Sequence, residues 1–149
     1  MDSIYTVDGK LLAAGSNQPF SLSAANLSYA DVRGRNLRNS KFVVCDMSRI
    51  QAEGVNLAGC TLSGTLFSYA HAPFANFAKS YSGAVDFYQS NLYGADFSDA
   101  KLGATSFQNC DLRNADFSRA KLVITDFRGA KLEGADFTGA DIYTALFSN

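Results

Sequence analysis

The amino-acid sequence predicts an all-β solenoid with four sides in each coil, and three observations lead to this prediction. From Leu22 to Phe147 every fifth residue is large and apolar at 23 of 26 positions, and no insertion or deletion breaks the register. Ten of the 12 Phe but none of the 7 Tyr lie on this central column, which indicates a dry interior because a buried phenol needs a hydrogen-bond partner. When central residues 20 positions apart are placed above one another, the resulting columns become nearly uniform in residue type, as in Phe67, Phe87 and Phe107.

The five-residue period requires the backbone to turn at every repeat. It advances about 140° around an α-helix and changes faces on a flat strand, so neither regular element keeps one face inward. From Phe87 onward the central residues alternate between Phe and Leu, finally Ile, which favours an even number of sides. Two sides enclose nothing and six would leave a hole, so four sides, with coils about 4.8 Å apart, are expected. One side would carry Phe67, Phe87, Phe107, Phe127 and Phe147, and the opposite side Phe77, Phe97, Phe117 and Phe137.

The segment before the repeats has the pattern of a β-hairpin. Ile4–Val7 and Lys10–Leu12 flank Asp8-Gly9, a dipeptide typical of tight hairpin turns. The sequence therefore predicts an N-terminal hairpin cap over residues 1–19 and a repeat region over residues 20–149.

The repeats resemble a known family. Segments such as Ala95–Asp99 (ADFSD), Ala115–Arg119 (ADFSR) and Ala130–Gly134 (AKLEG) resemble the pentapeptide repeat family, with its consensus A(D/N)LXX, over about Phe20–Asn149. The resemblance implies a right-handed quadrilateral β-helix. Two departures stand out: residues 66–93 are irregular, with Ala72 and Ser82 on the central column, and no helix is expected after the repeats.

The last coil is predicted to have an uncovered apolar end. A coil of unpaired backbone and apolar side chains favours association unless another element covers it. A second copy is the simplest cover, so we expect a homodimer through Ile142, Leu146 and Phe147.

Composition excludes several classes of function. A formal net charge of −1, with no side carrying a polycationic track, argues against direct nucleic-acid binding. No apolar run approaches the length of a membrane span, and Met1–Gly15 lacks the pattern of a secretory signal, so no membrane contact and a cytoplasmic location are expected. Three cysteines without a CxxC pair fit a reducing compartment.

No catalytic, metal or cofactor site is expected. His71 is the lone histidine and is predicted to be an exposed turn residue. Cys45, Cys60 and Cys110 occupy the small inward column, which favours packing over reactivity. Aspartates that precede central residues are predicted to bond turn backbone rather than a cation; they are Asp86, Asp96, Asp116, Asp126 and Asp136.

A candidate partner surface lies between Leu66 and Tyr93, where large aromatic residues stand off the central column. They are Tyr69, Phe74, Tyr81, Tyr88 and Tyr93, beside His71 and Pro73. Aromatic residues anchor interfaces out of proportion to their number. The alternative is that Phe74 or Tyr81 folds inward to fill space left by Ala72 and Ser82.

These features predict a noncatalytic scaffold that presents a rigid surface to a protein partner. The family resemblance also permits an alternative, a DNA-mimicking or other topoisomerase (gyrase)-binding protein of the fluoroquinolone-resistance kind. No side of this rod is strongly acidic and no loop interrupts the register, so the scaffold function is favoured.

Overall fold

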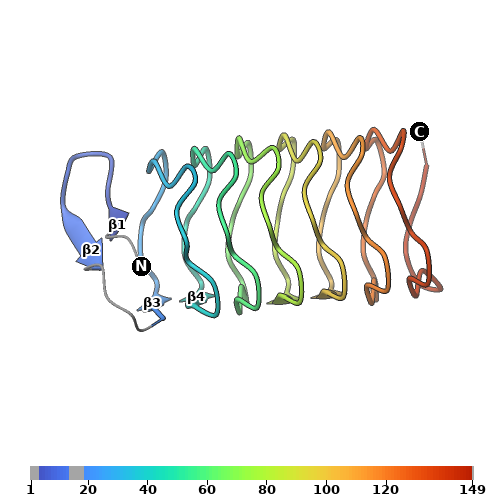
Figure 1. Ribbon diagram of the computed structural model, residues 1–149, viewed down its shortest axis with the longest axis horizontal. Helices are drawn as coiled ribbons and strands as arrows, with labels where there is room; N and C mark the ends of the chain where they lie inside the picture. Colours follow the sequence, from blue (N-terminus) through green and yellow to red (C-terminus); the bar gives the residue numbers. More distant parts are fainter. Residues whose placement is uncertain (1–3, 14–18, 149) are drawn as a thin grey trace.

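The computed structural model describes residues 4–13 and 19–148 and has the shape of a straight rod (Figure 1). Its strands are β1 (Ile4–Tyr5), β2 (Leu11–Ala13), β3 (Ser21–Ser23), β4 (Lys41–Val43), β5 (Tyr81–Gly83) and β6 (Lys101–Gly103). The described residues contain no helix, and so none that could cross a membrane.

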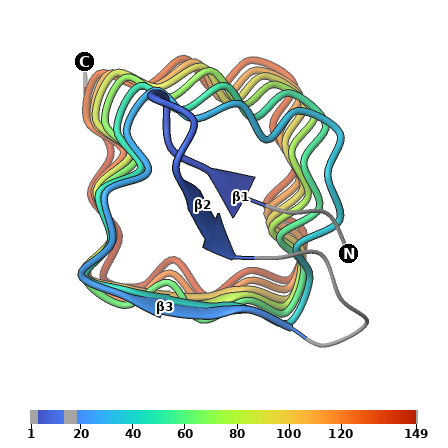
Figure 2. The ribbon, with the colours of Figure 1, turned by 90° about the vertical axis from the view of Figure 1, so that its left-hand side faces the viewer.

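The coils stack in parallel and keep one register along the rod. β3 pairs with β4 and β5 with β6, each at an offset of 20. Isolated bridges continue the same register from Asn26↔Asp46 to Asp126↔Leu146. Backbone groups are paired between neighbouring coils: Phe67 N–H donates to the Asp86 carbonyl at 2.7 Å, for example. Seen from its N-terminal end, the rod has a square outline (Figure 2), which confirms the four-sided fold.

A left-handed backbone residue stands at each corner. Among the described residues, every fifth position from 24 to 139 has a positive φ, whether it holds glycine or a larger residue. Aspartates stabilise the turns as predicted, since Asp86 Oδ1 accepts the Tyr88 N–H at 2.9 Å and Asp96 Oδ1 accepts the Ser98 N–H at 2.8 Å. Because the chain turns at each corner, the side chains of successive central residues all point towards the long axis of the rod.

From Phe67 onward, two opposite sides of the interior carry stacked ladders of phenylalanine rings that meet edge to face. Phe67 stacks on Phe87 with centroids 5.0 Å apart, and Phe77 stacks on Phe97 at 4.8 Å. Phe77 also meets Phe87 edge-on at 5.5 Å. These are favourable aromatic geometries, and the rings are fully buried.

The two ends of the rod differ. At the N-terminal end β1 and β2 form the expected antiparallel hairpin, and Ile4 is buried against the core. Figure 2 shows this hairpin lying across the square opening of the coils. At the other end, Ile142 and Phe147 are exposed, although Phe147 stacks on Phe127 with centroids 5.0 Å apart. Residues 1–3 and 14–18 of the predicted cap lie outside the described residues.

Candidate protein-binding surface

The four sides are named here by their central residues. Side A runs through Phe42, Ser82 and Leu102, side B through Phe67 and Phe87, side C through Ala72, Leu92 and Leu112, and side D through Phe77 and Phe97. Because one full coil separates bridged positions such as Gln51 and His71, positions half a coil apart lie on opposite sides. Sides A and C are therefore opposite each other.

The aromatic residues do not fill the interior. Phe74 is 59% exposed and Tyr81 is 56% exposed, so the alternative in which either ring folds inward is wrong. The central column is closed without them: Ala72 is fully buried, and the buried Ser82 hydroxyl shares a 2.9 Å hydrogen bond with the Thr105 hydroxyl.

An aromatic cluster with an arginine lies at the corner between sides B and C. The Tyr69 ring meets Tyr88 edge-on, with centroids 5.9 Å apart and planes at 89°. Arg49, one coil earlier, places its Cζ atom 4.5 Å from the Tyr69 centroid, which is a cation–π contact. Within the described part of the chain the Arg49 guanidinium has no hydrogen-bond or ion-pair partner. Its N–H groups therefore remain available at the surface.

A second cluster of two aromatic rings and an arginine lies along side C. Phe74 meets Tyr93 edge-on at 5.6 Å, and the Arg113 Cζ atom lies 5.6 Å from the Tyr93 centroid. Asn114 Nδ2 donates to the Tyr93 hydroxyl at 2.8 Å, and Arg113 pairs with Asp111 at 2.7 Å. The Arg113 guanidinium beside Asp111 holds the pKa of that carboxyl below its ordinary value. Each ring is thus held by its neighbours.

His71 lies between the two clusters, but not in the turn predicted for it. It is half-buried and occupies a β-bridge position between Gln51 and Asn91. Its backbone N–H donates to the Ile50 carbonyl at 3.0 Å. The position before a central residue belongs to the ladder between coils, which is why the exposed-turn prediction was wrong.

The structure separates Tyr81 from the other predicted site residues. Tyr81 is the first residue of β5 on side A. It stands half a coil from His71 and therefore lies on the opposite side of the rod. The remaining residues, together with the two arginines, form what we call the aromatic–arginine surface: Arg49, Tyr69, His71, Phe74, Tyr88, Tyr93 and Arg113. Sequence reasoning missed the arginines, although each stands exactly one coil repeat from the tyrosine it covers.

The cysteines are packed thiols. Burial raises the pKa of Cys60 and Cys110 to about 12. Cys60 Sγ donates to the Leu37 carbonyl at 3.1 Å, and Cys110 Sγ donates to the Phe87 carbonyl at 2.8 Å. A neutral, buried thiol is a poor nucleophile and metal ligand. Across residues 4–13 and 19–148, no group of three or more His, Cys, Asp or Glu side chains is placed to hold a metal ion.

Comparison with known proteins places this geometry in a family. The model of the pentapeptide repeat region matches residues 80–149, and that of pentapeptide repeats in eight copies matches residues 45–80. A comparison with proteins of curated function gave no match.

Solved structures show the same fold. One is HetL, a pentapeptide repeat protein involved in heterocyst differentiation regulation from the cyanobacterium Nostoc sp. strain PCC 7120. It is 21% identical, with a TM-score of 0.73 over 87% of this chain and 69% of HetL. Rfr23 from the cyanobacterium Cyanothece 51142 is 17% identical, with a TM-score of 0.61 over 86% of this chain and 91% of Rfr23. QnrB1, a plasmid-mediated fluoroquinolone resistance protein, is 19% identical over 91% of this chain and 94% of its own, with a TM-score of 0.40. The two family models together cover residues 45–149, and the chain belongs to the pentapeptide repeat family.

Proposed function

We propose that this protein is a noncatalytic binding scaffold and that its aromatic–arginine surface contacts a protein partner. The observation that carries the proposal is the exposure of large aromatic side chains that the core does not use: Phe74 is 59% exposed and Tyr69 is 44% exposed. Both stand at corners, where the left-handed φ is adopted by glycine and by many other residue types, so the corner itself does not call for a large aromatic side chain. Folding alone therefore does not account for the two rings.

The composition of the surface matches that of an interface anchor. Tyrosine and arginine dominate the binding energy of many protein interfaces. The edge-to-face contacts limit the movement of the rings, so less conformational entropy is lost when a partner binds. Arg49 adds an unpaired guanidinium that suits a carboxylate or a backbone carbonyl on the partner.

The topoisomerase-directed alternative has less support. The bridges keep an offset of 20 between 26 and 146, so no loop is inserted between the coils. The aspartates of side D do not form an isolated acidic stripe, because Arg119 pairs with Asp99 at 2.9 Å beside them. Inhibition of gyrase supercoiling by the purified protein would favour this alternative over the scaffold function.

A double substitution tests the surface. Tyr88→Ala combined with Tyr93→Ala removes one ring from each cluster, and we expect it to abolish capture of the partner from a lysate of the source organism, with the melting temperature unchanged. The matched control is Tyr5→Ala combined with Tyr143→Ala, which removes two exposed tyrosines, one in the N-terminal hairpin and one in the last coil, away from this surface. Partner capture retained by the first variant, or a large fall in its melting temperature, would contradict the proposal.

The apolar end of the last coil carries a separate proposal. Ile142, Leu146 and Phe147 are each between 44% and 49% exposed there. We propose that a second copy of the chain covers this end, because a two-fold pairing would bury both apolar ends at once and close the assembly.

A further inference from the structure

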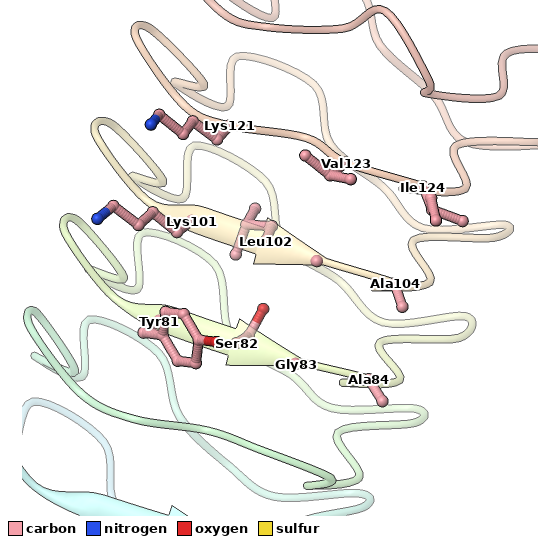
Figure 3. Close-up of a pocket in the computed structure, with 11 residues that line it drawn as sticks. Tyr81, Ser82, Gly83, Ala84, Lys101, Leu102, Ala104, Lys121, Val123 and Ile124 are labelled. Carbon is pink, nitrogen blue, oxygen red and sulfur yellow. The ribbon is translucent and has the colours of Figure 1, made fainter.

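Side A carries an apolar hollow of about 550 Å³ that is remote from the aromatic–arginine surface. Its floor is formed by β5 and β6, and Val123 and Ile124 close one end. In Figure 3, Tyr81, Lys101 and Lys121 form a row along one edge, and Ala84, Ala104 and Ile124 form a row along the other. A volume of this size lies within the usual range of binding sites, about 300–1,000 Å³.

The glycines in the floor are not required by the fold. Gly83 and Gly103 are in strands and, unlike the corner glycines, have no left-handed φ. A Cβ atom at Gly83 would meet nothing within 4 Å, and one at Gly103 would meet only the Ser82 carbonyl at 3.8 Å. Glycine weakens a strand interior, and it often marks a place where a ligand or another chain approaches closely. The missing side chains are what keep this hollow open.

At the neighbouring corners, glycine and alanine stand in the opposite order from the one that the backbone favours. The left-handed φ belongs to Ala84 (58°) and Ala104 (49°), whereas the glycine directly before each of them has no left-handed φ. Ile124, with φ of 53°, is β-branched and 65% exposed in the same row. Local backbone preference therefore does not explain this arrangement, whereas an open, apolar contact surface does.

The backbone of the hollow cannot accept an added strand. Ala84 N–H donates to the Gly103 carbonyl at 3.0 Å, and Ala104 N–H donates to the Val123 carbonyl at 2.9 Å. Since these groups are already used between coils, a ligand must be recognised by side chains. Strand addition, which relies on free backbone groups at a sheet edge, is excluded here.

Two lysines stand next to each other at the edge of the hollow. Lys101 and Lys121 occupy directly opposed positions on adjacent coils. Neither forms an ion pair within the described residues, including with Asp141, which follows Lys121 in the same row. Like charges placed opposite each other on neighbouring strands repel. An anionic group bound between the two ammonium groups would remove this repulsion.

We propose that the hollow binds a short segment of a protein partner in which a bulky apolar side chain is flanked by carboxylates. The apolar side chain would lie over Gly83 and Gly103, and the carboxylates would pair with Lys101 and Lys121. This site lies on the opposite side of the rod from side C and does not depend on the proposed role of the aromatic–arginine surface.

A peptide selection tests the proposal without knowledge of the natural partner. A phage-displayed library of random short peptides is selected on the wild-type protein after subtraction on Gly103→Leu, whose added side chain fills the hollow. We expect the selected peptides to combine Leu, Ile or Phe with adjacent Asp or Glu. Fluorescence anisotropy of the labelled peptides should then show binding weakened about tenfold or more by Gly103→Leu, and equally by Lys101→Glu combined with Lys121→Glu.

Four controls make the result specific. Lys41→Glu, in the same row but outside the hollow, and the Tyr88→Ala/Tyr93→Ala variant should both leave peptide affinity unchanged. Circular dichroism and the melting temperature must show that Gly103→Leu still folds, and Gly83→Leu provides a second filled variant. Failure to enrich peptides that depend on the hollow, or enrichment of peptides without carboxylates, would overturn the proposal. Recruitment to phosphatidylglycerol vesicles without such peptides would overturn it in favour of a lipid surface.

Discussion

The Phe74 ring lies directly across the backbone of Gly94 in the next coil. A Cβ atom added to Gly94 would stand 2.7 Å from both Cδ1 and Cε1 of that ring. Glycine at this corner therefore does two things: it adopts the left-handed φ of 65°, and it makes room for an aromatic ring one coil away. The orientation of Phe74 against Tyr93 depends on this small residue.

Substitution of Gly94 by Ala should displace the Phe74 ring. The left-handed φ alone should lower the free energy of unfolding by about 1 kcal/mol, and the steric contact should add to this loss. The matched control is Gly54→Ala, which has nearly the same φ of 64° and nothing within 4 Å of the added Cβ. Urea denaturation and the Phe74–Tyr93 nuclear Overhauser effect would measure both effects. Identical behaviour of the two variants would show that the ring contact has no energetic role.

Removal of a ring from the phenylalanine ladder should be far more costly than removal of a surface ring. Phe107 is fully buried and stacked between Phe87 and Phe127, so Phe107→Ala should cost about 3–5 kcal/mol by opening a cavity. Tyr88→Ala should cost well under about 1 kcal/mol because the side chain is only half-buried. Chemical denaturation of both variants measures the difference. Equal losses would contradict the assignment of the inward column.

The fold could be predicted because one column of residues carries almost all of its information. Burial of Phe or Leu at every fifth position is compatible with few backbone conformations. The length of one coil follows because identical residue types recur every 20 positions and stack on each other. The coil length of 20 residues could also have separated Tyr81 from the other candidate site residues, because Tyr81 stands half a coil from His71. The outward orientation of Phe74 could not be predicted in this way, because it depends on contacts in three dimensions: the ring packs against Tyr93 and lies over Gly94. Nor does the sequence show that Ser82 is satisfied inside the core by Thr105.

The hollow on side A was also beyond sequence reasoning. The register places Gly83 and Gly103 directly after central residues, one position before the corners, so the sequence alone separates them from the corner glycines. Only the three-dimensional structure shows that the space above them is open.

The buried thiols should make the protein less stable at high pH. The folded-state pKa of Cys60 and Cys110 is raised to about 12 from an ordinary value of 9.0, so the neutral thiol is favoured in the folded state. The stability from this preference is fully present below pH 9 and is lost as the pH rises towards 12, because only the unfolded chain then ionises freely. At a pH near 10 the loss should be about 1 kcal/mol for each thiol.

Denaturation at pH 8 and at a pH near 10 measures this alkaline loss. The control is Cys60→Ala combined with Cys110→Ala, which inserts the commonest residue of the same small inward column. The variant should lose less stability than the wild type between the two pH values. An equal loss in both proteins would assign the alkaline effect to other groups.

The exposed end of the last coil should make the protein dimeric. Phe147 stacks on Phe127 through one face of its ring but remains 44% exposed, and Ile142 and Leu146 are exposed beside it. Light scattering should therefore report about twice the chain mass of 16.0 kDa. Leu146→Glu or Phe147→Glu places a charge in the contact and should give a monomer, whereas Tyr29→Glu, near the opposite end, should remain a dimer. A wild-type monomer, with a mass unaffected by the charge at 146 or 147, would show that no second copy covers this end.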